Sequence, residues 1–265
     1  MMKEIENILQ VHLRNRKHRK RILEVSQGLE ALHIGPAFSC LEIVDLIYFN
    51  LLNESDTFIL SKGHGAMAQY AVMLAKGLLT EDQFKSICQN DSNLGGHPDR
   101  GNPGVVASTG SLGHGLPIGL GLAIANLEMN SSNHVYIVMS DGELMEGSNW
   151  EAILLAPTLK ISNLTIFIDH NKSISRGRIP EMHPNFMPIG PKISSFGWDV
   201  IEADGHNTAE LFSNYVSVAS SEKPKAVICH TTKGKGVSFM ENNPIWAYRS
   251  PNREEYEIAM NELDV

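Results

Sequence analysis

Short apolar runs alternate with segments of helical period through the second half of the chain. Four such runs lie at residues 135–139, 164–168, 198–201 and 226–229. Polar or glycine-containing turns follow them, so we predict four strands. Strands that are largely apolar, separated by helices, are typical of a parallel sheet covered by helices on both faces. The pattern therefore predicts an α/β fold, and no repeat or linker divides residues 1–265 into more than one domain.

Two helices can be placed from their caps and their apolar spacing. Ser148 can cap the first of them. Its predicted apolar face carries Trp150, Ile153, Leu154 and Leu159. Asn207 can cap the second helix, which continues through Val218. Residues 8–25 also keep helical spacing, and we expect the basic run at residues 14–21 to form a solvated face or a subunit contact.

Composition and charge exclude several classes of protein. Acidic side chains outnumber lysine and arginine by 30 to 22, which argues against a protein that binds nucleic acid through its phosphates. No uninterrupted run of 18 apolar residues predicts a membrane span, and charged residues interrupt any signal-peptide core at the N-terminus. The three cysteines lie far apart without Cys-x-x-Cys spacing, which favours buried thiols in a reducing, cytoplasmic compartment.

Polar and glycine-rich clusters follow several of the expected strands. They occupy residues 61–65, 140–143 and 169–171. Ligands of parallel α/β sheets bind outside the carboxyl ends of the strands. We therefore expect these clusters to form one shared site.

Asp141 and Asn171 are candidate metal ligands within these clusters. Asp141 ends one strand and precedes Gly142, which lets the backbone approach a ligand closely, and Asn171 ends the next strand. A carboxylate, an amide oxygen and a nearby carbonyl would offer Mg²⁺ three oxygens and leave positions for a diphosphate and water. Asp and Asn are also common in ordinary turns, and these two residues taken alone favour that interpretation.

The surrounding motifs resemble the transketolase family over nearly the whole chain. Residues 140–152, together with Asn171, resemble that family's thiamine diphosphate fingerprint. Further blocks match in the same order, at residues 61–65, 95–99, 108–115, 196–198, 204–206 and 233–243. Several ordered blocks are specific where one alone would be weak. The resemblance implies the family's diphosphate-binding α/β fold, and the chain looks like the N-terminal subunit of a split transketolase.

The resemblance also implies which residues bind the cofactor. Asp141, Asn171 and the carbonyl of Ser173 resemble the ligands of Mg²⁺ or Ca²⁺. The groups that match contacts to thiamine diphosphate are Gly142 and His64 at the diphosphate and Gly110 and Leu112 around the rings. Glu146 matches a buried acid that, in the family, joins a dimer-interface network linking two active sites.

Three histidines are the implied catalytic residues: His33, His64 and His97. Ketol transfer moves protons as a C–C bond breaks and re-forms, and imidazoles with a pKa near neutrality suit that work. His114 lies beside the cofactor loop, and the sequence leaves its role open. Lys233 and Lys235 can serve phosphates, but a solvent-exposed turn is the favoured interpretation. At residue 247 the family pattern has a histidine, whereas this chain has Ala247.

The implied function is transfer of a two-carbon ketol unit between sugars or sugar phosphates. In this family the acid that activates the cofactor comes from another domain, so the resemblance implies a partner subunit with the pyrimidine-binding domain, in an α2β2 assembly. Two alternatives stay open. One is the α subunit of a 2-oxo acid dehydrogenase-type enzyme, against which the histidines argue, and the other is a degenerate, non-catalytic cofactor-domain partner, suggested by Ala247.

Overall fold

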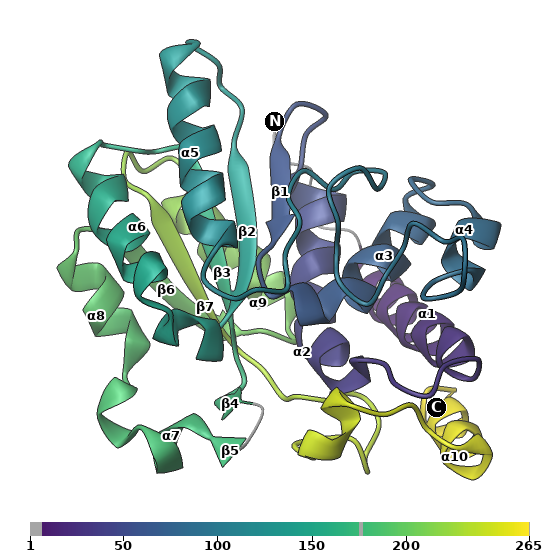
Figure 1. Ribbon diagram of the computed structural model, residues 1–265. Helices are drawn as coiled ribbons and strands as arrows, with labels where there is room; N and C mark the ends of the chain where they lie inside the picture. Colours follow the sequence, from purple (N-terminus) through teal and green to yellow (C-terminus); the bar gives the residue numbers. More distant parts are fainter. Residues whose placement is uncertain (1–6, 175–176, 265) are drawn as a thin grey trace.

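The computed structural model describes residues 7–174 and 177–264 and is built around a five-stranded sheet (Figure 1). The strand order is β1-β2-β3-β7-β6, and all neighbouring strands are parallel. The strands are β1 (Thr57–Leu60), β2 (Val135–Ser140), β3 (Leu164–His170), β6 (Asp199–Asp204) and β7 (Lys225–His230). The predicted parallel α/β fold is confirmed.

Helices cover both faces of this sheet because its side chains point alternately to opposite sides. In β2, Ile137 and Met139 enter one apolar cluster, whereas Tyr136 and Val138 enter the other. The first cluster includes α5 (Gly115–Glu128), α6 (Gly147–Thr158) and α8 (Ile189–Ser195). The second includes α1 (Ile8–Ser26), α2 (Ile34–Leu46), α3 (Ala66–Ala75) and α9 (Thr208–Val218). Figure 1 shows these two groups of helices on either side of the sheet.

Shorter elements complete the described chain. The two-residue strands β4 (Ser173–Ile174) and β5 (Gly177–Arg178) pair antiparallel. The short α-helices are α4 (Glu81–Lys85), α7 (Ile179–Met182) and α10 (Arg253–Glu262). Single turns of helix occur at η1 (Ile47–Leu51), η2 (Gly63–Gly65), η3 (Gly142–Met145), η4 (Pro184–Phe186) and η5 (Pro244–Ala247). In Figure 1, β4, β5, α7 and α10 lie at the lower edge, toward which β2 runs.

The two predicted helices form, but one differs in detail. Asn207 caps α9 by accepting a hydrogen bond from the amide of Glu210, as expected. Helix α6 begins at Gly147, and Ser148 donates instead to the carbonyl of Gly113 at 2.6 Å. Its buried residues are Asn149, Ala152, Ile153 and Ala156. The predicted apolar face was therefore wrong at Leu154 and Leu159, which are 56% and 46% exposed because the small alanines face the sheet.

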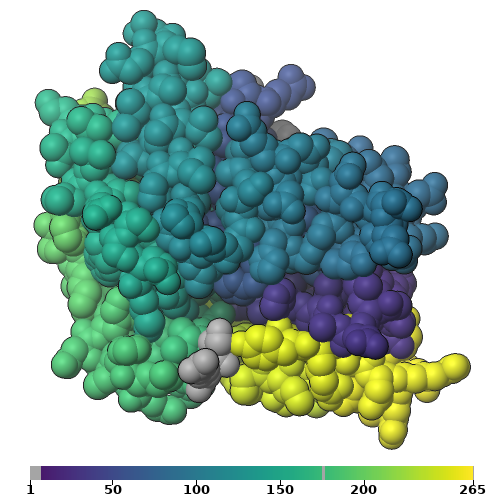
Figure 2. All heavy atoms as spheres, in the orientation of Figure 1, coloured from purple at the N-terminus to yellow at the C-terminus, as the bar shows by residue number. Residues whose placement is uncertain are grey.

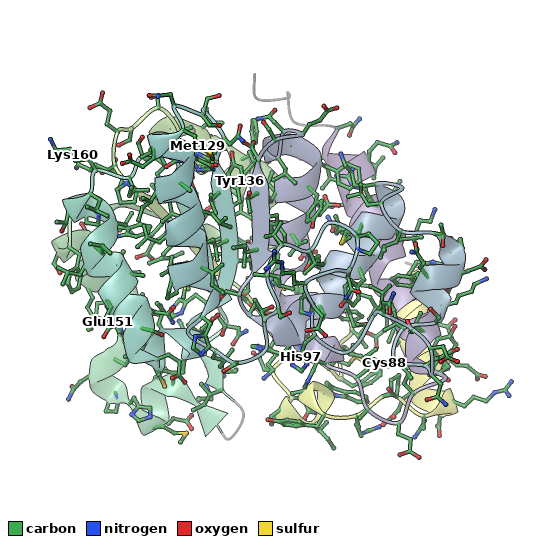
Figure 3. The ribbon with its side chains drawn as sticks, turned by 45° about the horizontal axis from the view of Figure 1, so that its top comes forward. Cys88, His97, Met129, Tyr136, Glu151 and Lys160 are labelled. Atoms are coloured by element: carbon green, nitrogen blue, oxygen red, sulfur yellow. The ribbon has the colours of Figure 1, made fainter. Side chains whose placement is uncertain are left out.

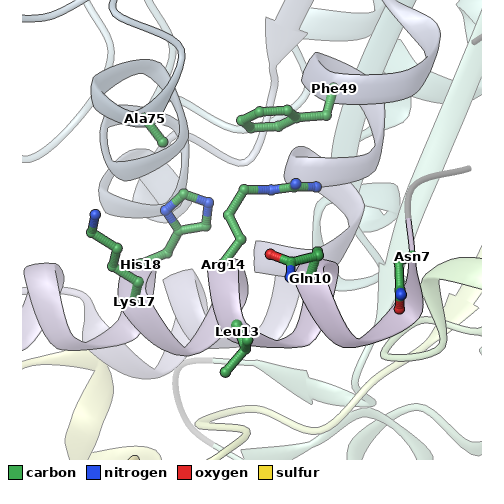
Figure 4. Close-up of a pocket in the computed structure, with 8 residues that line it drawn as sticks. All are labelled: Asn7, Gln10, Leu13, Arg14, Lys17, His18, Phe49 and Ala75. Carbon is green, nitrogen blue, oxygen red and sulfur yellow. The ribbon is translucent and has the colours of Figure 1, made fainter.

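Two arginines of the basic run of α1, Arg14 and Arg19, are paired inside the fold, so the prediction of a solvated face was wrong for these two residues. Arg19 is buried against Glu42 at 2.7 Å. Arg14 bonds Asp45 and lies 3.8 Å from the centroid of the Phe49 ring, toward which it reaches across a cavity beside α1 (Figure 4). Lys20 pairs with Asp264, and Arg21 pairs with Glu24 and Glu81, at the protein surface. The side chains of the run that remain exposed are Arg16 and Lys17.

One helical stretch, residues 34–51, is long and apolar enough to cross a membrane by length and composition. A count of consecutive apolar residues does not find it, because Glu42 and Asp45 interrupt the run. Within the fold 94% of this stretch is buried, and its side chains belong to the second apolar cluster. Buried core helices pass the same test of length and composition, so this stretch is weak evidence for a membrane span.

Candidate active site

A cavity of about 250 Å³ lies at the carboxyl edge of the sheet. Its lining includes seven of the predicted site residues: His33, His64, His97, Gly110, Leu112, Gly142 and Ser173. Figure 3 shows His97 on the lower side of the molecule, away from Met129 and Lys160 at the opposite end of the sheet. The expected shared site at the ends of the strands is therefore present as a cavity.

The three predicted catalytic histidines face one another across this cavity. The ring centroid of His33 lies 5.4 Å from that of His97 and 6.3 Å from that of His64. Burial lowers the pKa of His64 well below its usual value, and the nearby Lys62 ammonium lowers it further. Burial and the neighbouring His33 lower the pKa of His97 as well. Both rings are therefore neutral near pH 7.

Close backbone packing holds these histidines in place. Gly110 has φ +138°, and a β-carbon there would lie 2.9 Å from the ring of His97. A β-carbon on Gly63, next to His64, would lie 2.6 Å from the amide nitrogen of Gly110. The hydroxyl of Tyr70 donates to the carbonyl of His97 at 3.0 Å. Gly63 thus lets the loop of His64 pack on the loop of Gly110, and Gly110 lets that loop pack on His97.

Asp141 is fully buried between the lining residues Ser140 and Gly142. One carboxylate oxygen accepts from the amide of Gly142 at 2.8 Å, and the other from the amide of Lys172 at 2.6 Å and from His170 Nδ1 at 3.0 Å. Burial raises the pKa of this carboxyl group despite these donors. A bound divalent cation would act in the opposite direction, because it favours the ionised form.

Asn171 and Ser173 complete an oxygen-rich corner beside Asp141. The amide oxygen of Asn171 accepts from the backbone amide of Ser173 at 2.9 Å, so the two residues form one tight turn. A β-carbon on Gly142 would lie 2.7 Å from Ile174, so only glycine lets this turn approach the end of β2. The donor set of carboxylate, amide and carbonyl oxygens fits a hard cation such as Mg²⁺. Within the described residues no group of three or more His, Cys, Asp or Glu side chains could hold a metal.

A buried ion pair behind the cavity was not predicted from the sequence. Lys62 and Asp169 are both fully buried and bonded to each other. Asp169 also accepts from Ser39 Oγ at 2.7 Å and from Thr231. Burial opposes ionisation, yet their attraction holds the pKa of Asp169 below and that of Lys62 above its usual value. Both residues stand in polar clusters of the sequence, but nothing in the sequence shows that they meet.

An acid buried within the single chain, Glu143, lies close in sequence to the predicted residue Glu146. Glu146 is exposed in this chain, whereas Glu143, three residues earlier, is fully buried. The carboxylate of Glu143 accepts from Ser61 Oγ and from the amides of Gly113 and Ser140. Burial raises the pKa of Glu143, which these donors oppose. The predicted role of Glu146 at a subunit interface involves a second chain and stays a prediction. Within the single chain, the carboxylate of Glu143 joins the segments that carry Ser61, Gly113 and Ser140.

The remaining predictions near the site have mixed outcomes. Lys233 was expected in an exposed turn, but it is 7% exposed and lines the cavity. Burial and the charge of Lys62 lower its pKa. Lys235 is half-buried and lies 3.4 Å from Glu241. His114 is exposed and is not among the residues that line the cavity.

Ala247, where the family pattern has a histidine, and the next residue, Tyr248, also border the cavity. Ala247 is 5% exposed and lies in its lining, next to Tyr248. The carbonyl oxygen of Ala247 bonds His33 Nδ1, and the Tyr248 ring lies 6.4 Å from the His33 ring. The C-terminal part of the chain therefore supplies one wall of the same site.

Known proteins resemble this chain over most of its length. One of the subunits of an apulose-4-phosphate transketolase, from Actinobacillus succinogenes, is 39% identical over 241 residues, 87% of each chain. The 6-deoxy-6-sulfo-D-fructose transketolase subunit SqwG of Clostridium sp. is 33% identical, covering 93% of both chains. The crystal structure of transketolase from Campylobacter jejuni superimposes with a TM-score of 0.88 at 24% identity, over 98% of this chain and 43% of that chain. This last likeness shows the shared fold.

The profile of a protein family covers most of the chain. The family described as transketolase, thiamine diphosphate binding domain, matches residues 48–255, which contain the predicted site residues except His33. With the relatives above, this match decides the family. The chain belongs to the thiamine diphosphate-binding domain family of transketolases.

Proposed function

We propose that this chain is the cofactor-binding subunit of a two-component transketolase that transfers a two-carbon ketol unit from a ketose donor to an aldose acceptor. The observation that carries the proposal is the meeting of His33, His64 and His97 with the turn after β2 around one cavity. Relatives that span the same length are named as transketolase subunits.

The proposed cofactor-binding part of the cavity lies at the carboxyl ends of β2 and β3. Asp141, Asn171 and the carbonyl of Ser173 would hold Mg²⁺ or Ca²⁺, whose charge would offset that of the diphosphate of thiamine diphosphate. Gly142 and His64 border the space for the diphosphate, and Gly110 and Leu112 border the space for the rings. When bound, thiamine diphosphate supplies the electron sink needed to break and re-form a C–C bond.

The histidines would move protons on the substrate. Neutral imidazoles within hydrogen-bond reach of a sugar hydroxyl can remove its proton and return it when the acceptor binds. The lowered pKa values of His64 and His97 keep these rings in the neutral form near pH 7. A 2-oxo acid has no such chain of hydroxyl groups, and together with the family match this disfavours the alternative 2-oxo acid dehydrogenase function.

The partner in this proposal is a second polypeptide with the pyrimidine-binding domain, assembled as α2β2 in the cytoplasm. The names of the relatives, each a subunit, support a partner. Sugar or sugar-phosphate substrates follow from the same names, and apulose 4-phosphate and 6-deoxy-6-sulfo-D-fructose belong in any panel of donors.

The test is reconstitution from purified components. The chain alone, with thiamine diphosphate and Mg²⁺, is expected to give no ketol transfer on the donor panel. Adding the partner subunit should produce turnover, and light scattering should give the mass of two chains of each kind. Robust turnover by the chain alone would contradict the two-component proposal. Cofactor binding without turnover on every donor would favour the non-catalytic alternative.

A further inference from the structure

The imidazole of His33 is held by the backbone of a residue 214 positions away. Its Nδ1 lies 2.5 Å from the carbonyl oxygen of Ala247. A carbonyl oxygen only accepts hydrogen bonds, so Nδ1 must carry the proton. In a neutral imidazole the other nitrogen, Nε2, is then the acceptor. Within the described residues Nε2 makes no hydrogen bond, and the ring lines the cavity.

The carbonyl of Ala247 is available because it ends a short helix. Ala247 is the last residue of η5, and carbonyls at the end of a helix lack a partner within it. The neighbouring Trp246 is buried, and its indole nitrogen donates to the carbonyl of Phe239 at 3.1 Å. A β-carbon on Gly35 would lie 3.4 Å from Trp246. The start of α2, which carries His33, therefore packs directly on η5.

A charged clamp on the protein surface holds η5 from the other side. The guanidinium of Arg249 lies 4.2 Å from the ring centroid of Trp246 and donates to both carboxylate oxygens of Glu255, at 2.7 and 2.5 Å. Glu255 also completes the capping box of α10 with Asn252. Figure 2 shows this C-terminal segment, in yellow, against the purple N-terminal helix.

We propose that the carbonyl of Ala247 fixes His33 as its Nδ1–H tautomer, with Nε2 as the proton acceptor in the cavity, and that Arg249 is the positioning residue that holds this carbonyl through Trp246. The proposal deepens the proposed function and rests on it for its kinetic part only. It assigns the C-terminal segment a role in proton transfer although none of residues 249–255 lines the cavity.

The tautomer can be measured without any substrate. The full-length chain, labelled with ¹⁵N in its histidines, should show His33 with a protonated Nδ1 and an unprotonated Nε2 at pH 7.5. His33→Gln assigns the signals by the pair that disappears. In Arg249→Ala the His33 signals should move toward the average of the two tautomers, and Arg249→Lys, which keeps a cation over Trp246, should restore part of the wild-type pattern. Arg253→Ala, which removes an exposed arginine paired with Glu257 on the same helix, is the matched control.

Kinetics of the assembled complex provide the second readout. Positioned acid–base groups raise reaction rates by about 10²–10⁴-fold. Because Arg249→Ala would leave the His33 ring less well aligned, we expect kcat to fall roughly tenfold with little change in KM. Arg253→Ala should leave both unchanged. An Nε2–H tautomer in the wild type, or an unchanged pattern in Arg249→Ala, would overturn the proposal. If NMR shows the expected tautomers but the complex turns over no donor, the positioning of His33 by Ala247 and Arg249 is supported. The proposed transketolase function is then contradicted on its own.

Discussion

The ammonium of Lys62 and the carboxylate of Asp169 form an ion pair from which water is completely excluded. Lys62 follows β1 and Asp169 lies at the end of β3, so the pair ties together two strands that are separated by β2 in the sheet. Lys62 also donates to the carbonyl of Pro36 at 3.1 Å, which brings α2 into the same network. The pair therefore joins three of the segments that carry the cavity.

Removing one partner of this pair should be costly. Lys62→Met leaves the carboxylate of Asp169 buried and uncompensated, and we expect a loss of about 3–5 kcal/mol in the free energy of unfolding. The control Lys223→Met removes an exposed lysine that lies 3.1 Å from Asp199, and should cost less than about 1 kcal/mol. Denaturant unfolding of both variants checks this. A double variant with Asp169→Asn should recover part of the loss, and equal costs in the two single variants would contradict the prediction.

The proposed metal ligands can be tested by cofactor binding. Asp141→Ala removes the one carboxylate of the donor set, and Asn171→Ala removes its amide oxygen. Losing a residue that merely supports a ligand weakens metal binding by about 10–100-fold, so each variant should lose at least roughly tenfold in Mg²⁺-dependent affinity for thiamine diphosphate. Calorimetry on the assembled complex measures this, with Glu151→Gln, an exposed acid on α6, as the control. Unchanged affinity in either variant would refute the assignment of that ligand.

Ala247 stands where the family has a histidine, and restoring that side chain should increase activity. The residue lines the cavity, so an imidazole at this position can enter it while the backbone carbonyl still holds His33. We expect Ala247→His to raise ketol transfer to a sugar-phosphate acceptor by roughly tenfold, below the full range for a positioned acid–base group because three histidines are already present. Steady-state rates on the donor panel check this, with Ala247→Gly as the control. A lower rate on every donor would show that Ala247 belongs to a pocket shaped for another substrate.

Glu42 should make stability depend on pH in the acid range. Burial opposes its ionisation, but Arg19 and His206 lower its pKa from 4.5 to about 2. Because the folded-state pKa lies below the unfolded value, the stabilisation is complete above about pH 4.5 and is lost as the pH falls toward 2. At about 1.4 kcal/mol per pKa unit it amounts to roughly 3 kcal/mol near neutral pH.

The matching variant is Glu42→Gln. Urea unfolding should show it to be less stable than the wild type at pH 7, and the difference should shrink steadily between pH 4.5 and pH 2. A difference that stays constant over this window would mean that packing, not charge, accounts for the effect of the substitution.

Much of the fold could be predicted from local pattern. The apolar runs became β2, β3, β6 and β7 with ends shifted by only a few residues. The strands β2, β3 and β7 are buried on both faces and must be apolar along their length, whereas the edge strand β6 is only partly buried. The polar clusters after them meet at one edge because parallel strands end there. That residues 1–265 form a single domain stays a prediction.

The partners of individual charged residues could not be predicted in this way. The sequence analysis took Lys233 as exposed, whereas its side chain is buried, and it did not identify Glu143 as a buried acid. The apolar face of α6 was misjudged at Leu154 for a related reason, since the small alanines pack on the sheet. In each case the rotation of a turn or helix against its neighbours decides which side chain is buried.

The sequence by itself determined the family, the parallel sheet and the edge at which the polar clusters meet, because these depend on strand composition and on glycine-rich blocks in a certain order. Only the tertiary structure decided that Lys62 meets Asp169 and that His33 bonds Ala247, contacts that join residues 107 and 214 positions apart. Such pairings arise when separate elements pack around a common core, and no local periodicity encodes them. The protonation states of the site, and hence its chemistry, are determined at that level.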